Sequence, residues 1–297
     1  MTSLSVRAPA VAGAFYPADP EVLRDQVDRL LADAPAPAPG ASRPAAVIVP
    51  HAGYVYSGST AALAYRLLAG AQVDKVVVVG PTHRVAVRGV ALPTAEAFAT
   101  PLGTMRVWPG ARAALADVPW ATVHEGTHRD EHAVEVQLPF LQRVLGDVDV
   151  VPLNAGAATG EQVADVIEAL CSSHTLVDTA RSAQTDEQAR SPRPSRVWDS
   201  PATLVVISSD LSHYLPYDEA RARDEATVAQ IMALDGPLDH EQACGATPVN
   251  GMLELARRRG LVPRLLGACS SGDTAGDRNR VVGYCAVAFD PAETVRP

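Results

Sequence analysis

Three histidines follow apolar segments that have the composition of buried strands. "VIVP" runs into His51, "VVVVGPT" into His83 and "LVVISSDLS" into His213, and Asp210 lies three residues before the last of them. Ligands of open α/β sheets bind beyond the carboxyl ends of the strands. Imidazole is a frequent ligand of transition metals and an acid or base at neutral pH. If the three strands are parallel neighbours, the sequence predicts one crevice that binds a metal or transfers protons.

Each of these histidines, taken alone, also fits a simpler interpretation in which it only caps its strand through local hydrogen bonds. The convergence of three such strand ends favours a shared site. The loop "PHAGYVYSG" adds glycines that leave room for His51, and Tyr54 and Tyr56, which can form an aromatic pocket wall.

A second cluster of histidines lies in "HEGTHRDEH", which ends at His132. Its last five residues fit H-x-x-E-H, the inverted zinc-protease motif, whose chemistry requires both histidines on one helical face. The helical pattern begins only near Glu131, because the preceding "GTHRDE" is polar and begins with glycine. We therefore expect His124 and His128 to be solvated loop residues, which disfavours a protease. The side chains expected to line a pocket from the start of the helix are Glu131, His132 and Glu135.

Cysteine supplies a further candidate ligand. The four cysteines are scattered without a C-x-x-C pair, a pattern typical of thiols in a reducing cytoplasm. Cys244 precedes a segment in which Thr247 and Pro248 predict a helix start, where a thiolate is stabilised as a metal ligand or nucleophile. The alternative for Cys244 is a small buried apolar side chain. That role is expected for the other three: Cys171, Cys269 and Cys285.

The composition excludes several other functions. The chain has 297 residues, 47% of them hydrophobic, and a net charge of −9 without a basic run, so no nucleic-acid partner is expected. It shows neither a secretory signal nor an apolar run of the ~18 residues that a membrane span needs, and we expect a cytoplasmic protein without a membrane partner. The sequence contains no P-loop and no G-x-S-x-G nucleophile elbow.

Strand and helix patterns alternate along the chain. The longer strands are expected at 45–50, 75–84, 147–154 and 202–214, and the helices at 20–33, 59–70, 131–145, 160–173, 217–234 and 250–260. This alternation predicts a single α/β domain over residues 1–297, with a mixed, largely parallel central sheet flanked by helices. Short alternating runs within 88–108 predict an antiparallel extension. Residues 172–202, which are polar and lack apolar periodicity, are expected to form a mobile surface insertion.

Seven segments, in order, resemble the Memo-like family, whose prokaryotic members are called AmmeMemoRadiSam system protein B. They are "VAGAFYPADP", "IVPHAGYVYSG", "VVVVGPTHR", "DEHAVEVQLPFL", "VVISSDLSHY", "ACGATPVNGML" and "SGDTAGDRNRVVGYCAVAF". The resemblance extends from about Arg7 to Phe289 and is interrupted mainly at 172–202. It implies a fold similar to that of the class III extradiol (LigB-type) non-haem iron dioxygenases.

The resemblance also implies roles for individual residues. By family motif, His51 and His83 match the two histidine ligands of those dioxygenases, and His213, with Asp210 beside it, matches their acid/base histidine. Cys244 stands where they carry a ligand glutamate, as it does in other Memo-like proteins. A thiolate softens the site toward Cu(I), Zn(II) or a thiolate-bound iron. We therefore do not expect this chain to cleave a catechol ring merely because its fold resembles that of the dioxygenases.

Two functions follow as expectations. The first is an iron- or copper-dependent oxidoreductase, with zinc as a further candidate metal, acting on a small-molecule substrate. The residues expected to shape its pocket are Phe15, Tyr54, Tyr56 and Glu135. The alternative is a non-catalytic module that binds a peptide or small molecule on the same fold. The family's name also suggests a functional link to a radical-SAM protein and an AMMECR-like protein.

Overall fold

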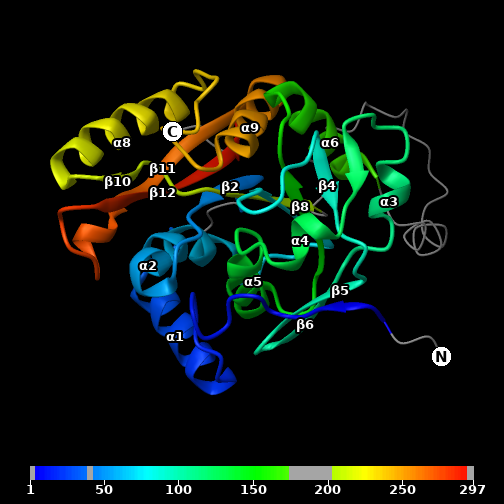
Figure 1. Cartoon of the computed structure of the whole chain (residues 1–297), viewed down its shortest axis with the longest axis horizontal. Coiled ribbons are helices and arrows are strands. Elements are labelled where there is room, and N and C mark those ends of the chain that lie inside the picture. Colours follow the sequence, from blue (N-terminus) through cyan, green and yellow to red (C-terminus); the bar gives the residue numbers. More distant parts are fainter. Residues whose placement is uncertain (1–3, 39–42, 174–202, 293–297) are drawn as a thin grey trace.

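A nine-stranded mixed sheet forms the centre of the computed structural model, which describes residues 4–38, 43–173 and 203–292 (Figure 1). Eight strands follow the order β10-β12-β2-β9-β3-β8-β4-β7, and β11 pairs with β12. Their bounds are β2 Ala46–Val49, β3 Lys75–Pro81, β4 Val90–Leu92, β7 Ala121–Val123, β8 Asp149–Ala155, β9 Thr203–Ser208, β10 His213–Leu215, β11 Leu261–Ser270 and β12 Val281–Pro291.

The middle of this sheet is parallel. β2 pairs with β9, β9 with β3 and β3 with β8, whereas β12 and β4 flank this group in antiparallel orientation. The Val- and Ile-rich segments form these inner strands, because strands covered on both faces need apolar side chains at every position. The expectation of a mixed sheet is confirmed, but it is parallel mainly in its middle, because four of the eight pairings between its described strands are antiparallel.

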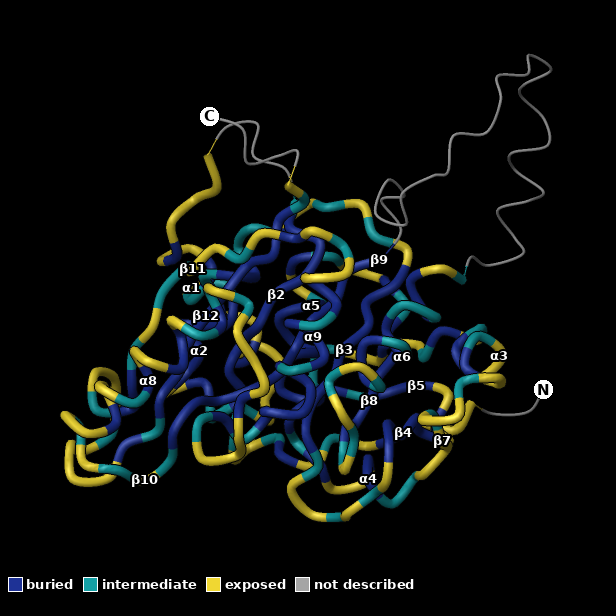
Figure 2. The backbone as a smooth tube through the Cα atoms, turned by 90° about the horizontal axis from the view of Figure 1, so that it is seen from above, coloured by how far each residue is buried: buried dark blue, intermediate teal, exposed yellow. Residues whose placement is uncertain are grey.

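Helices cover both faces of the sheet. In the view of Figure 1, α6, α8 and α9 lie above it and α1, α2 and α5 below it. Alternate residues of β2 divide in the same way: Ile48 packs in the core with α6 and α9, whereas Val47 and Val49 pack in the core with α1, α2 and α5. Figure 2 shows the buried inner strands between more exposed loops. The helices are α1 Pro20–Asp33, α2 Tyr54–Tyr65, α3 Ala111–Ala114, α4 Gly126–Arg129, α5 Leu138–Leu145, α6 Gly160–Ser172, α8 Tyr217–Met232 and α9 Ala246–Arg259, with short 3-10 helices η1 Arg66–Leu68, η2 Glu135–Gln137 and η3 Ser271–Asp273.

Local sequence explains where several helices begin and end. Asp19 caps α1 by accepting hydrogen bonds from two backbone N–H groups of the first turn, and Thr159 and Gln162 form a capping box at the start of α6. α9 ends at Gly260, whose φ of 63° suits glycine. None of the described helices combines the length and the apolar character that a membrane-spanning helix requires.

Three helices begin at other positions than expected, and one of them, α9, begins at Ala246 rather than at residue 250. The helix expected at 59–70 already begins at Tyr54, so the tyrosines after His51 lie in its first turn. The helix expected at 131–145 forms only as η2 followed by α5. Pro139 lies in the first turn of α5, where its missing N–H leaves no hydrogen bond unmade.

The expected antiparallel extension at 88–108 divides between two sheets. β4 joins the central sheet beside β8, and a separate three-stranded sheet has the order β1-β5-β6. The strands of this smaller sheet are β1 Val6–Arg7, β5 Ala97–Thr100 and β6 Gly103–Arg106. The insertion expected at 172–202 lies outside the described residues, apart from its first two positions, and Ser172 is the last residue of α6.

The register of the parallel strands brings three side chains to one edge of the sheet. The last residue of β2 pairs with the last residue of β9, and β3 lies on the other side of β9. His51, His83 and Asp210 each follow two positions after the end of β2, β3 and β9, respectively. They therefore occupy the carboxyl edge, where ligands bind in sheets of this kind.

Candidate metal centre

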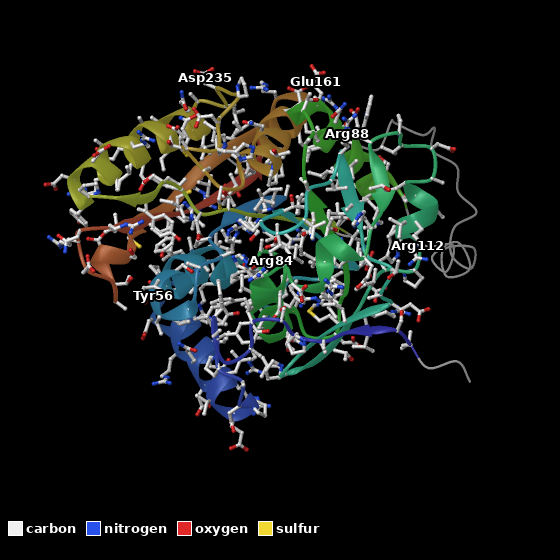
Figure 3. All side chains as sticks on the ribbon, viewed as in Figure 1. Tyr56, Arg84, Arg88, Arg112, Glu161 and Asp235 are labelled. Atoms are coloured by element: carbon white, nitrogen blue, oxygen red, sulfur yellow. The ribbon has the colours of Figure 1, made fainter. Side chains whose placement is uncertain are left out.

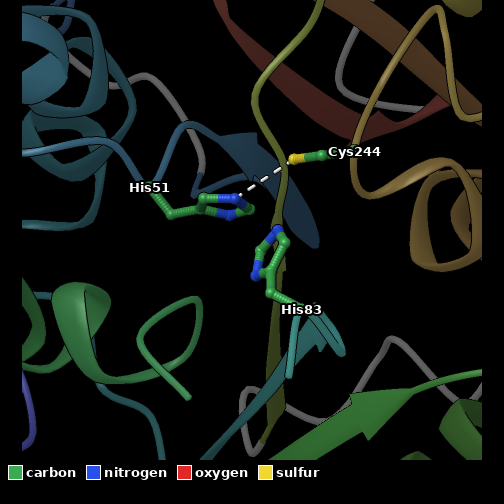
Figure 4. Close-up of side chains that lie close together, drawn as sticks. All are labelled: His51, His83 and Cys244. Carbon is green, nitrogen blue, oxygen red and sulfur yellow. Dashed lines mark hydrogen bonds between the residues drawn. The ribbon is translucent and has the colours of Figure 1, made fainter. Parts of the chain in front are cut away.

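Donor atoms of His51, His83 and Cys244 converge at this edge (Figure 4). The ligand atoms lie within 4.8 Å of one another, and Cys244 Sγ lies 3.2 Å from His51 Nε2. Cys244 is carried by the loop before α9, which passes close to the end of β9: a Cβ on Gly245 would lie 2.6 Å from the Ser209 side chain. Glycine at this position therefore lets the thiol approach the histidines.

The hydrogen bonds of His51 determine which ring nitrogen can bind a metal. Its Nδ1 lies 3.0 Å from Ser208 Oγ, and the hydroxyl of Ser208 donates its only proton to the Ala133 carbonyl at 2.6 Å. His51 Nδ1 must therefore donate to Ser208, which leaves Nε2 unprotonated and facing Cys244. Burial, together with neighbouring imidazoles, lowers the pKa of His51 well below its usual value, so the ring is neutral at pH 7.

A buried carboxylate orients His83 in a similar way. Glu131 Oε1 accepts a hydrogen bond from His83 Nδ1 at 2.8 Å, and Oε2 accepts one from the His83 backbone N–H at 2.7 Å. The backbone N–H groups of His132 and Ala133 also donate to Oε1, at 2.9 and 3.1 Å. Burial acts to raise the pKa of Glu131, but hydrogen bonds from His132 and His83 hold that pKa well below its usual range. Nε2 of His83 thus remains available to a metal.

His132 adds another imidazole to the cluster. Its ring stacks on His83 with the centroids 4.7 Å apart and meets His51 edge-on at 5.3 Å. With His83 and Glu131 it forms a second group of suitable spacing for a metal. Because Glu131 already accepts several hydrogen bonds from this loop, we interpret it as the support of the histidines, and the group with Cys244 as the metal ligands.

His128 lies away from this cluster, and the expectation that it is solvated is wrong. It is 1% exposed, its Nε2 donates to the Ala91 carbonyl at 3.0 Å and its Nδ1 accepts from Asn154 Nδ2 at 3.2 Å. Burial lowers the pKa of His128 to about 4. Both ring nitrogens have structural partners, which rules out the zinc-protease interpretation of H-x-x-E-H. His124 is exposed, as expected.

His213 lines the same cavity, but a main-chain carbonyl rather than the nearby Asp210 holds its ring. His213 Nδ1 donates to the Leu211 carbonyl at 2.9 Å, so Nε2 is the unprotonated nitrogen of the neutral ring. Asp210 Oδ1 instead accepts a hydrogen bond from the His51 backbone N–H at 2.7 Å. Burial raises the pKa of Asp210, although the hydrogen bond from His51 opposes the shift. Asp210 therefore holds the loop of His51, while a main-chain carbonyl holds His213.

The donors line a cavity of about 820 Å³ with aromatic walls. Phe15 and Tyr56 contribute to these walls, Tyr56 from the first turn of α2 (Figure 3). Tyr54 and Glu135, expected in the pocket, do not line it. Tyr54 is buried and donates its hydroxyl to a main-chain carbonyl at 2.6 Å, and Glu135 is fully buried in an ion pair. Both residues support the site from the core.

The protonation of Cys244 does not match the stabilised thiolate, which was one of the two alternatives for this residue. Burial raises the pKa of its thiol, and the neighbouring Asp210 carboxyl adds to the shift. The cost of desolvating a thiolate thus outweighs the stabilisation from the nearby helix N-terminus. Without a metal, Cys244 is a protonated thiol at pH 7, which suits it to a ligand role better than to that of a free nucleophile. Of the cysteines expected in the core, Cys171 and Cys285 are buried and Cys269 is half-buried.

Comparisons with known proteins place this arrangement in one family. The family model described as Memo-like protein matches residues 7–180 and 179–288. The chain belongs to the Memo-like family. It is 34% identical over 300 residues to a MEMO1 family protein of Methanopyrus kandleri, covering 95% of this chain and 98% of the relative. A MEMO1 family protein of Aquifex aeolicus is 32% identical over 295 residues, covering 96% of this chain and all of the relative. The expectation of a Memo-like chain with a LigB-like α/β fold is confirmed.

In this Memo-like chain, replacing Glu131 by glutamine should weaken metal binding. Glutamine keeps the shape of the side chain, but its NH₂ group cannot accept the hydrogen bonds that Glu131 receives from His83 and its own loop. We expect the affinity for zinc, measured by competition with a chromogenic chelator, to fall about 10- to 100-fold. Glu125→Gln is the matched control, because the Glu125 carboxylate accepts its hydrogen bonds, within the described part of the chain, from Thr94 and Ala95 and not from a histidine. Equal affinities of Glu131→Gln and wild type would contradict the orienting role.

Proposed function

We propose that this Memo-like protein binds an iron or copper ion through His51, His83 and Cys244 and acts as an oxidoreductase on a small-molecule substrate. The observation that carries the proposal is the convergence of these three donors within 4.8 Å at the carboxyl edge of the sheet. In both histidines the other ring nitrogen is already hydrogen-bonded to the protein. Partners of this kind fix the orientation of imidazole ligands in metal sites.

The donor set fits a redox metal. Two neutral imidazoles and a thiolate form a softer site than two histidines and a carboxylate, and they favour copper, zinc or thiolate-bound iron. When bound, iron or copper would supply one-electron redox chemistry beside the cavity. Zinc is a further candidate, for which the same residues would serve without a change of oxidation state.

His213 is the proposed acid/base of the reaction. The Leu211 carbonyl holds its Nδ1–H, so the proton that His213 takes up or gives is carried on Nε2. The ring lines the cavity together with the metal donors, where it can reach a bound substrate. Asp210 is proposed to act through the position of His51, whose backbone N–H it binds. Phe15 and Tyr56 would hold the apolar part of the substrate and limit the access of water.

Oxygen uptake by metal-reconstituted protein tests the proposed reaction. With a panel of catechols, thiols and reductants, we expect iron- or copper-loaded protein to consume oxygen faster than metal-free protein for at least one class. His213→Gln should lower this rate about 100-fold or more, as expected for loss of a general acid/base, without changing the metal content. His240→Gln is the control, because His240 is exposed and does not line the cavity. No uptake across the whole panel would reject the oxidoreductase.

A non-catalytic binding module is the second candidate, and the aromatic walls of the cavity favour it. The rings of Phe15 and Tyr56 offer stacking surfaces that bind a ligand without turnover. Tight binding of a peptide or small molecule, combined with no oxygen uptake, would support this function over the first.

The proposed setting follows from the family and the composition. We propose that the chain is one domain, that it acts in the cytoplasm, and that it is functionally linked to a radical-SAM protein and an AMMECR-like protein. Its four cysteines are free thiols, which fits a reducing compartment. A net charge of −9 without a basic run disfavours a nucleic-acid partner.

A further inference from the structure

One side chain with a permanent positive charge, Arg280, lines the cavity that holds the metal donors. Its guanidinium lies 5.0 Å from the centroid of the Tyr214 ring, and no carboxylate of the described residues forms an ion pair with it. Arg278, two positions earlier, similarly lies 4.3 Å from the Tyr217 ring. Arg278, however, is 3.9 Å from the Asp273 carboxylate and does not line the cavity. Arg280 thus contacts an aromatic ring but has no carboxylate partner among the described residues.

The pairing of β10 with β12 places Arg280 at the mouth of the cavity. Side chains of a strand point alternately to opposite faces. Val281 is fully buried, whereas Arg280, Val282 and Tyr284 all line the cavity. Exposure decreases along this row, from exposed Arg280 through half-buried Val282 to Tyr284, which is 1% exposed. Val282 pairs with His213, so the side chains of Arg280, Val282 and Tyr284 extend from the mouth of the cavity along the proposed acid/base histidine.

An irregular backbone supports the aromatic ring that Arg280 contacts. Tyr214 has a φ of 62°, a left-handed conformation that residues other than glycine seldom adopt. It lies between His213 and Leu215, where the register of β10 shifts against β12. The side chain of Tyr214 is 61% exposed, and its ring faces the guanidinium. Residues in such conformations are concentrated at ligand sites and active sites.

We propose that Arg280 binds a carboxylate or phosphate group of a planar, apolar substrate whose reacting part lies near the metal donors and His213. The proposal deepens the proposed function, on which it depends for the reaction but not for binding. The planar guanidinium can donate two parallel hydrogen bonds to an oxyanion, and stacking on Tyr214 holds it in place for them. The aromatic side chains of the walls suit a planar substrate.

Charge around the mouth agrees with this assignment. The chain carries a net charge of −9 and would repel an anion without a local cation. Asp277 also lines the cavity, but its Oδ1 accepts a hydrogen bond from the Asn279 backbone N–H at 2.7 Å and thereby shapes its own turn. Arg280 is the arginine of this lining whose positive charge can offset the negative charge of Asp277 and attract an anion.

Calorimetric titration with small aromatic probes tests the proposal. Benzoate and phenyl phosphate carry the two anionic groups, and benzamide is the uncharged match of benzoate. They are titrated into the full chain, both metal-free and loaded with zinc. We expect at least one anion to bind more tightly than benzamide, and Arg280→Gln to weaken its binding about three- to tenfold while benzamide binding stays unchanged. The anion that binds more tightly identifies the group as a carboxylate or a phosphate.

Two further variants provide the controls. Arg278→Gln removes a neighbouring arginine that also stacks on a tyrosine, and it should leave anion binding unchanged. Arg280→Lys should retain part of the affinity, because lysine keeps the charge but lacks the planar donor pair.

Several results would overturn the proposal. The first is equal affinity for all three probes. The second is an affinity for the anion that does not change in Arg280→Gln, or that falls equally in Arg278→Gln and Arg280→Gln. The third is anion binding that appears only with zinc and persists in Arg280→Gln. Metal content measured on the same samples distinguishes failure of the anion site from failure of the proposed metal site. Wild-type protein that binds no metal but still prefers the anion would reject the metal site and retain the anion site.

Discussion

Replacing Glu135 by glutamine should lower the free energy of unfolding by about 3–5 kcal/mol, the typical cost of breaking a buried ion pair by removing one charge. Glu135 is 0% exposed, and its Oε2 pairs with Arg7, which is 5% exposed. Its Oε1 accepts hydrogen bonds from the Tyr16 hydroxyl at 2.5 Å and from the Val11 backbone N–H at 3.0 Å. In the variant, Arg7 would stay buried without a carboxylate.

The effect should extend to the metal centre, because Arg7 also holds the loop that carries Glu131. Arg7 Nε donates to the His128 carbonyl at 3.0 Å, and Nη2 donates to the Glu131 carbonyl at 2.6 Å. Arg7 lies in β1, far from Cys244 in the sequence. The ion pair of Arg7 with Glu135 therefore connects the N-terminal strand to the residues that orient His83.

Asp28→Asn provides the matched control. Asp28 pairs with Arg143 through two hydrogen bonds of 2.8 and 2.9 Å, but their side chains are 45% and 34% exposed. Loss of an exposed pair of this kind should cost less than about 1 kcal/mol. Urea denaturation followed by circular dichroism compares the two variants. If Glu135→Gln destabilises the chain no more than Asp28→Asn, the buried pair does not have the structural role assigned to it.

Replacing Cys244 by serine should both weaken metal binding and remove its dependence on pH. Burial raises the pKa of the Cys244 thiol further above neutrality, so metal binding must displace one thiol proton. His51, whose pKa is lowered, carries its proton on Nδ1 at pH 7, so its Nε2 can bind a metal without losing a proton. The affinity of the wild type should therefore rise with pH, about tenfold per pH unit between pH 6.5 and 8.5.

Competition with a chelator at several pH values measures this dependence. In Cys244→Ser we expect a nearly flat profile and a loss of affinity larger than the about 10- to 100-fold expected for Glu131→Gln, because a ligand itself is missing. Cys269→Ser is the control, since Cys269 is half-buried and its Sγ lies 3.0 Å from Thr60 Oγ1, outside the group of donors. A wild-type profile without a slope would show that Cys244 does not bind the metal as a thiolate.

The carboxyl edge of the sheet was predictable from the sequence, because its strands are long apolar runs. Composition alone predicts such strands, and a residue that follows directly after one must lie at its end. The positions of His51, His83 and Asp210 are of this kind. The partner of Asp210 was not predictable, because the backbone turns after β9 and directs the carboxylate to the His51 loop, far away in the sequence.

Partners that are distant in the sequence also explain why the surroundings of His128 and Glu135 differ from expectation. A five-residue motif does not predict the surroundings of His128, which lies in α4 and whose partners Ala91 and Asn154 lie in β4 and β8. Glu135 lies in a helical turn beside the expected pocket, but the arginine that pairs with it is 128 positions away in the sequence. Residues whose surroundings are set by distant segments can be placed only when the tertiary contacts are known.

Elemental analysis of anaerobically purified protein, wild type beside Cys244→Ser, tests the metal site of His51, His83 and Cys244 most directly. We expect about one iron or copper ion per wild-type chain and almost none in the variant, with unchanged circular dichroism spectra. Wild-type protein without a stoichiometric transition metal, or a Cys244→Ser variant that retains the wild-type amount, would contradict this site.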